Sequence, residues 1–143
     1  MATYLPAELA EILRLHRLWS LNEGGKGGIR ANLSGANLSG AIGLPIAADA
    51  PARLLAVAEA ALATPDALEM GSWHQCETTH CICGWAEHLG GPLANLIIKI
   101  YGNDVGGLML LGVKAHAHFY SSNNKARAFL QSVIDNATAT EVQ

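Results

Sequence analysis

The sequence has few aromatic and few charged residues. Of its 143 residues, 6% are aromatic and 15% are charged, whereas half are hydrophobic. This composition is far from that of disordered chains, which are polar and highly charged. Because aromatics are scarce, Ala, Leu, Ile and Val must build most of the core. A chain of this length buries roughly two-thirds of its unfolded surface, so we expect a globular fold of one or two small units.

The sequence also lacks a strong excess of either charge. Nine basic and twelve acidic residues give a formal charge of −3, whereas a nucleic-acid-binding domain usually has a pI above about 9. No uninterrupted apolar run reaches the roughly 18 residues that suggest a membrane helix. Glu8 and Glu11 interrupt the N-terminal segment, where a signal peptide has its hydrophobic core. We therefore expect a cytoplasmic protein that binds neither nucleic acid nor membranes.

The apolar residues recur at helical spacing through most of the chain, and Gly and Pro separate the segments. The pattern predicts helices over residues 6–19, 51–63, 79–89, 92–101, 104–113 and 123–136. Asp49 is the expected N-cap of the second helix, and Thr78 or Thr79 that of the third. Residues 137–143 are expected to fray. The predicted fold class is mainly α, a small helical bundle preceded by an N-terminal helix.

An internal repeat of five residues lies between the first two helices. Ala-Asn-Leu-Ser-Gly at 31–35 recurs at 36–40, and a degenerate third copy begins at Ala41. The repeat resembles the pentapeptide-repeat family, common in phage and prophage genomes, whose chain winds as a right-handed β-helix. The resemblance implies a partial β-helical coil with Leu33 and Leu38 pointing inward. A partial coil must pack against helices to be stable, so we expect two parts, residues 1–48 and 49–143.

The densest group of chemically reactive residues lies at 73–85, which reads Trp-His-Gln-Cys-Glu-Thr-Thr-His-Cys-Ile-Cys-Gly-Trp. It resembles a short signature of small phage and bacterial proteins that have no agreed activity. Cys83 stands where that signature has Ala. The resemblance therefore implies an origin in phage or prophage genomes and implies no reaction.

Three interpretations of this segment compete. Cys76, His80 and Cys81 are candidate zinc ligands, because structural zinc is held by Cys and neutral His. Alternatively, Cys81 is a nucleophile whose pKa a helix start lowers, with His116 or His118 as its base. The third interpretation is packing by buried thiols. We favour packing, because Cys81 and Cys83 on one helix would lie about 200° apart. We expect no metal, no cofactor, and at least two buried thiols that react slowly.

No sequence motif assembles a catalytic site. The chain has no phosphate-binding loop and no nucleophile, base and orienting group at motif spacing, so we expect a non-enzymatic protein. The resemblance to phage proteins implies an accessory protein in the host cytoplasm that binds and inhibits a host protein or complex, as anti-CRISPR inhibitors of bacterial immunity do. The expected partner-binding residues are Lys26, Arg30, Asn32 and Asn37. Two alternatives remain open, namely a metal- or thiol-dependent function at residues 76–83 and self-association through the apolar region 93–111.

Overall fold

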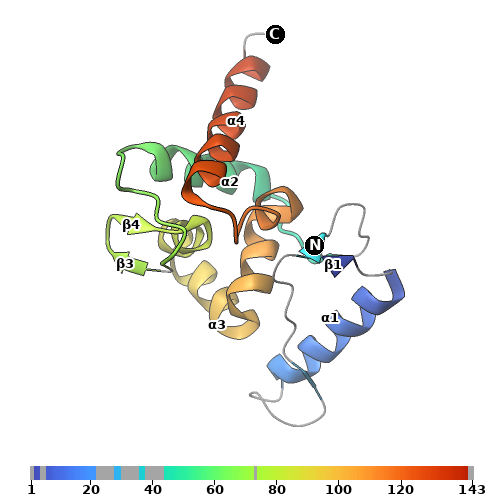
Figure 1. The fold of residues 1–143 in the computed structure, drawn as a ribbon. Coiled ribbons are helices and arrows are strands. Elements are labelled where there is room, and N and C mark those ends of the chain that lie inside the picture. Colours follow the sequence, from blue (N-terminus) through green and yellow to red (C-terminus); the bar gives the residue numbers. More distant parts are fainter. Residues whose placement is uncertain are drawn as a thin grey trace.

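The computed structural model describes residues 2–3, 6–21, 28–29, 36–37, 44–72 and 74–141. Within these residues the fold is mainly α, with four helices and four very short strands (Figure 1). The predicted fold class is confirmed at this level. The described residues contain no β-helical coil, and most of the pentapeptide repeat, residues 31–35 and 38–43, lies outside them.

The first helix, α1, spans Pro6–Leu21 and closely matches the predicted range. Proline fits the first turn of a helix, because its missing N–H has no intrahelical partner there. Leu9 is buried and packs α1 against Val105 and Leu108. Beside α1, strand β1 (Ala2–Thr3) pairs in parallel with strand β2 (Ala36–Asn37).

Helix α2 spans Ala50–Leu62, as predicted to within one residue at each end, and Asp49 is its N-cap. The capping interaction differs from the expectation, because the Asp49 side chain makes no hydrogen bond to the free backbone amides. It instead forms an ion pair of 2.9 Å with Arg53 one turn later. The Arg53 hydrogen bond lowers the pKa of Asp49 from its usual value.

A small hairpin replaces the predicted start of the next helix. Strand β3 (His74–Cys76) pairs antiparallel with β4 (Thr79–His80), so Thr79 is extended and is not a helix cap. Its hydroxyl donates to the Asp66 carbonyl, and the His80 amide donates to the Ala67 carbonyl. These bonds hold β4 against the turn that follows α2. The prediction of a helix from residue 79 is therefore wrong. The pairing with β3 and the turn after α2 use the backbone groups of residues 79–80 that a helix would need.

Helix α3 spans Ile82–His116 and is broken by three glycines. Gly91, Gly102 and Gly112 have φ angles of 62°, 78° and 83°, in the left-handed region that residues with a Cβ rarely adopt. The helical segments between them are 82–90, 92–101, 103–111 and 113–116. The predicted breaks near residues 91 and 102 are thus confirmed, and the glycines bend the chain so that successive segments face different neighbours.

By length and composition, α3 is also the one helix in the described part of the chain that is apolar enough to cross a membrane. Its most hydrophobic window of 18 residues has a mean hydropathy of 1.4, and 39% of that window is buried inside the protein. Charged residues such as Lys99 and Asp104 interrupt its apolar run, which is why the sequence pattern predicts no membrane helix here. The core helix of a soluble protein meets the same criteria of length and composition, and α3 contacts α2.

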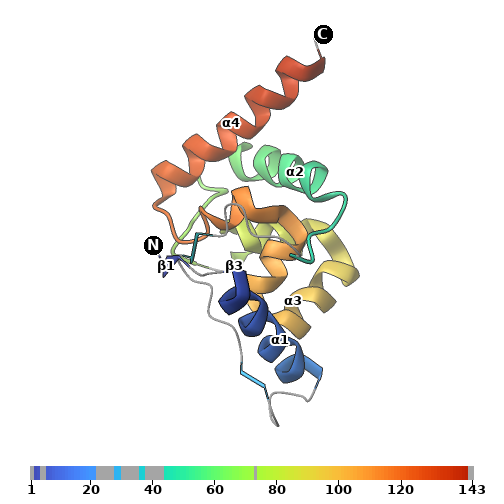
Figure 2. The same ribbon diagram turned by 90° about the vertical axis from the view of Figure 1, so that its right-hand side faces the viewer.

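Helix α4 spans Asn123–Glu141 and extends beyond α2 in both views (Figure 1 and Figure 2). It begins as predicted, with the Ser122 carbonyl accepting the amide of Ala126. Its end differs, because residues 137–141, expected to fray, continue the helix. The hydroxyls of Thr138 and Thr140 donate to carbonyls of the preceding turn, which tethers these side chains to the helix.

The main core lies where α2, α3 and α4 meet. Its fully buried members include Val57 of α2, Ile82 and Leu110 of α3, and Leu130 of α4. The core also extends to the turn after α2 through Leu68. Apolar burial of this kind contributes about 25 cal/mol per Å², and it places the start of α3, with its two cysteines, at the centre of the protein.

Candidate functional site

Cys81 is the N-cap of α3, and its sulfur accepts a hydrogen bond from the backbone. The Sγ atom accepts the amide of Gly84 at 3.3 Å, and the residue is only 8% exposed. Burial raises the pKa of this thiol, although the backbone amides at the helix start act in the opposite direction. The expectation that the helix start would lower the pKa of Cys81 is therefore wrong, because loss of hydration outweighs the helix dipole.

Cys83 is more deeply enclosed than Cys81. Its thiol donates to the Asn103 carbonyl at 3.6 Å, and burial raises the pKa of Cys83 well above its usual value. Gly107 faces it from the third segment of α3. A Cβ at Gly107 would overlap the Cys83 sulfur and lie 2.8 Å from the Phe119 ring. The expectation of two buried thiols is thus confirmed, and glycine is required opposite Cys83 because of its sulfur.

His80 is a buried member of an aromatic cluster and is 1% exposed. Its ring lies 4.7 Å from Trp85 in an edge-to-face arrangement and 4.9 Å from His88. The Trp85 indole donates to the Ala67 carbonyl at 2.7 Å. Edge-to-face aromatic pairs and buried indole hydrogen bonds stabilise packing. This candidate metal ligand therefore joins the start of α3 to the turn after α2.

The two histidines considered as bases contact other groups. His116 is buried, with its Nε2 atom 3.2 Å from the Asp104 carboxylate and its ring edge-to-face with Phe119. His118 is stacked on Phe129 at 4.1 Å, and burial lowers its pKa. The His116 contacts join the end of α3 to an earlier segment of α3 and to the turn that follows, whereas the His118 contact joins that turn to α4. These side chains thus have structural partners that do not include Cys81.

No group of three metal-ligating side chains exists among the residues that the structure describes. Cys76 lies on β3, where only the backbone is described, and it pairs in register with Thr79. Cys81, Cys83 and Asp104 are among the residues that line a cavity of about 180 Å³.

The residues expected to bind a partner fall at the edge of the described chain or outside it. Lys26, Arg30 and Asn32 lie outside the described residues. The backbone of Asn37 is described in β2, where it pairs with Thr3. The partner-binding role of Lys26, Arg30, Asn32 and Asn37 therefore stays a prediction.

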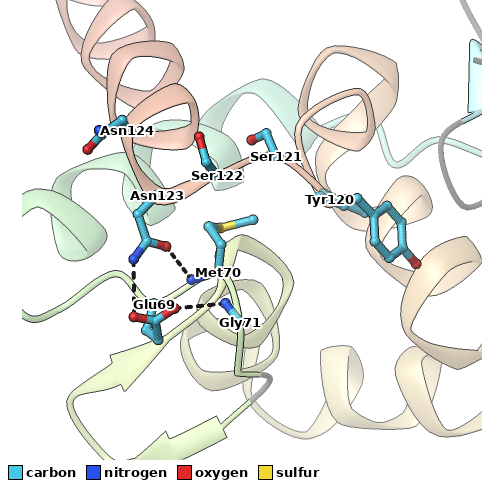
Figure 3. Close-up of a pocket in the computed structure, with 9 residues that line it drawn as sticks. Glu69, Met70, Gly71, Tyr120, Ser121, Ser122, Asn123 and Asn124 are labelled. Atoms are coloured by element: carbon cyan, nitrogen blue, oxygen red, sulfur yellow. Dashed lines mark hydrogen bonds between the residues drawn. The ribbon is translucent and has the colours of Figure 1, made fainter.

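A shallow polar pocket of about 590 Å³ lies where the turn after α2 meets the start of α4. Figure 3 shows the Asn123 side chain between two groups, accepting the Met70 amide at 2.7 Å and donating to Glu69 at 3.1 Å. Glu69 also accepts the Gly71 amide, and these two hydrogen bonds lower its pKa. Because Glu69 and Asn123 bind each other, they cross-link two elements and are not poised to react.

An apolar surface on α3 is the most unusual exposed feature. The four residues are Leu89, Leu93, Leu96 and Ile100, which are 48%, 57%, 52% and 38% exposed. We call them the exposed α3 face. Leu93, Leu96 and Ile100 lie on the second segment at spacings of three and four residues, as in a helix stripe that normally faces another element, and Leu89 precedes the break at Gly91. In both views, the second segment of α3 lies on the outside of the body (Figure 1 and Figure 2).

The sequence pattern predicts Leu93, Leu96 and Ile100 on an apolar helix within the self-association region 93–111 and Leu89 at the end of the preceding helix, but it does not indicate which of them are exposed. Spacing alone does not show which way an apolar stripe faces, because a stripe that faces solvent has the same period as one that faces the core. Comparison of the chain with protein-family models, with curated proteins and with solved structures finds no match.

Proposed function

We propose that this protein acts by binding and not by catalysis. It is an accessory protein of the phage type that binds and inhibits a host protein or complex, in the manner of inhibitors of bacterial immunity. The sequence supports the phage origin through the pentapeptide repeat and the 73–85 signature. The environment of Cys81 and Cys83 supports a non-enzymatic role, because a thiol with a raised pKa is a poor nucleophile at neutral pH.

The observation that carries the proposal is the exposed α3 face. Three large aliphatic side chains, Leu93, Leu96 and Ile100, share one exposed stripe of the second segment of α3, and Leu89 is exposed just before it. Burying such side chains is favourable, and exposed apolar patches typically mark interaction sites. A protein partner that covers Leu93 and Leu96 would supply the apolar contact that α2 and α4 supply elsewhere along α3.

The pentapeptide segment supplies a second part of this proposal. A partial coil would present Asn32 and Asn37 beside Lys26 and Arg30. Arginine is enriched among the residues that dominate interface energies. The coil and the exposed α3 face would then give the partner one polar and one apolar contact.

The test is capture of a partner from a bacterial host lysate, followed by affinity measurement with the purified partner. Leu93→Glu combined with Leu96→Glu should weaken binding at least about tenfold, because buried apolar anchors carry most interface energy. Asn95→Glu is the matched control, since Asn95 is exposed on the same segment and lies about 130° around the helix from the apolar stripe.

The outcomes separate the proposal from catalysis. A stoichiometric partner whose affinity falls in the double variant and is unchanged in the control supports the proposal. Equal affinity in all three proteins removes the exposed α3 face from the interface. Turnover of a small molecule that depends on Cys81 would instead establish the thiol-dependent alternative.

Self-association is a second candidate that the same face favours. Leu93, Leu96 and Ile100 belong to the region from which self-association was predicted, and all three are exposed in the single chain. Sedimentation velocity across a range of protein concentrations distinguishes the two. A dimer abolished by Leu93→Glu supports self-association, and a monomer at every concentration supports the host partner.

A further inference from the structure

A long apolar groove lies on the side of the protein formed by α2, α4 and the last turn of α3. Its volume is about 1000 Å³. One wall is alanine-rich and includes Ala50 and Ala52 of α2, and the floor includes Leu111 and Gly112. Ala50, Ala52 and Gly112 have a methyl group or no side chain, which leaves space between the elements beside the larger apolar side chains of Leu54 and Leu111.

The opposite wall is a regular face of α4. Phe129, Val133 and Ala137 lie four residues apart, and successive residues at this spacing lie above one another on a helix. From Phe129 to Thr140 the wall extends for about 16 Å, since a helix rises 1.5 Å per residue. An extended chain advances about 1.2 Å per bond, so a linear alkyl chain of about fourteen carbons matches this length.

The groove carries one charge. Among the described residues that line it, Lys114 alone has a charged side chain, and it is exposed. The hydroxyls of Ser132 and Thr140 on the α4 wall already donate to helix carbonyls. A ligand that matches this lining has an unbranched apolar body and a single anionic end that can pair with Lys114.

We propose that this groove binds a free long-chain fatty acid, with its carboxylate at Lys114 and its alkyl chain along the Phe129–Val133–Ala137 wall. The site is separate from the exposed α3 face. It can therefore be tested on the purified protein in the absence of any host partner.

The experiment is calorimetric titration of the full chain with tetradecanoate below its micelle concentration. We expect one site per chain, with affinity falling about tenfold in Lys114→Glu, since a charge-assisted contact is lost and a repulsion is gained. Lys125→Glu is the charge control, because Lys125 is exposed on α4 and does not line the groove. 1-Tetradecanol should bind at least about tenfold more weakly than the acid in the native protein.

Filling the groove gives an independent test. Ala137→Trp should abolish binding while circular dichroism stays helical, and Ala52→Trp on the facing wall is the second variant if the first does not fold. Saturable binding that both Lys114→Glu and the tryptophan variant reduce supports the proposal. Equal binding of acid and alcohol, unchanged binding in Lys114→Glu, or a dimer that Ala137→Trp dissociates would overturn it, the last by showing that a second copy fills the groove.

Discussion

At the start of α3 and in its second segment, burial is the opposite of what the residue types suggest. Residues 81–86 contain two thiols and follow a histidine, yet all six are buried and serve to cap, pack and join elements. Residues 89–100 read as ordinary core, yet four of their large aliphatic side chains are exposed. The difference teaches that chemical character does not identify a site by itself. Exposure and unsatisfied contacts identify the candidate interface, and it lies on the less reactive segment.

The largest expected effect comes from placing the same charge in each segment. Cys83→Asp should cost several kcal/mol and prevent folding, because a carboxylate there is buried without a partner. Leu93→Asp should change the free energy of unfolding by about 0.5 kcal/mol or less, since its side chain is mostly exposed. Urea unfolding followed by circular dichroism measures both. Similar losses in the two variants would erase the contrast between the segments.

The reactivity of the thiols sharpens the contrast further. Cys81 and Cys83 should react with a thiol reagent at least about a hundredfold more slowly in the folded protein than in urea. Access to either thiol requires local opening, and each 1.4 kcal/mol of opening free energy slows the reaction tenfold. In a Cys76→Ser variant, Cys81 and Cys83 are the remaining thiols, so the labelling reports on them alone. Rapid labelling of either thiol in the native state would show that the start of α3 is open.

Gly107 tests how tightly the buried segment is packed. Gly107→Ala should cost about 1–3 kcal/mol, because the added methyl group overlaps the sulfur of Cys83 and approaches Phe119. Combining it with Cys83→Ala should recover part of this loss, since the sulfur is then absent. A double-mutant cycle by chemical unfolding measures the coupling. Additive losses would mean that the two residues do not compete for the same space.

The smallest effect concerns pH. Because burial lowers the pKa of His118 in the folded protein, the unfolded chain takes up a proton more readily. Stability should therefore fall as the pH drops through the unfolded value of about 6.5. The slope of unfolding free energy against pH should be shallower in His118→Gln, with His88→Gln as the comparison. An identical slope in His118→Gln would contradict the stacked, half-buried position of this ring on Phe129.

Much of the helical architecture could be predicted because its signals are local. Pro6, Gly91 and Gly102 set helix starts and breaks through backbone geometry alone, and the predicted boundaries there hold. The start of α3 could not be predicted, because Thr79 pairs with β3 and donates to Asp66, a contact that no local pattern encodes. The end of α4 likewise continues past Asn136, although its composition suggested fraying.

The candidate site was predictable only in part. The burial of Cys81 and Cys83 followed from the general behaviour of free cysteine. The exposure of Leu93 and Leu96 did not, because it depends on how the break at Gly91 directs the second segment of α3 away from α2 and α4. A period of 3.6 identifies a stripe, and only the tertiary arrangement decides whether another element covers it.

Hydroxyl-radical footprinting of the free protein and of its complex with the captured host partner tests the central claim most directly. In the free protein, Leu93, Leu96 and Ile100 should be oxidised, whereas Cys81 and Cys83 should be protected despite their higher intrinsic reactivity. In the complex, the three aliphatic residues should become protected and the cysteines should not change. Undiminished oxidation of the exposed α3 face in the complex, or oxidation of the two cysteines in the free protein, would contradict the account.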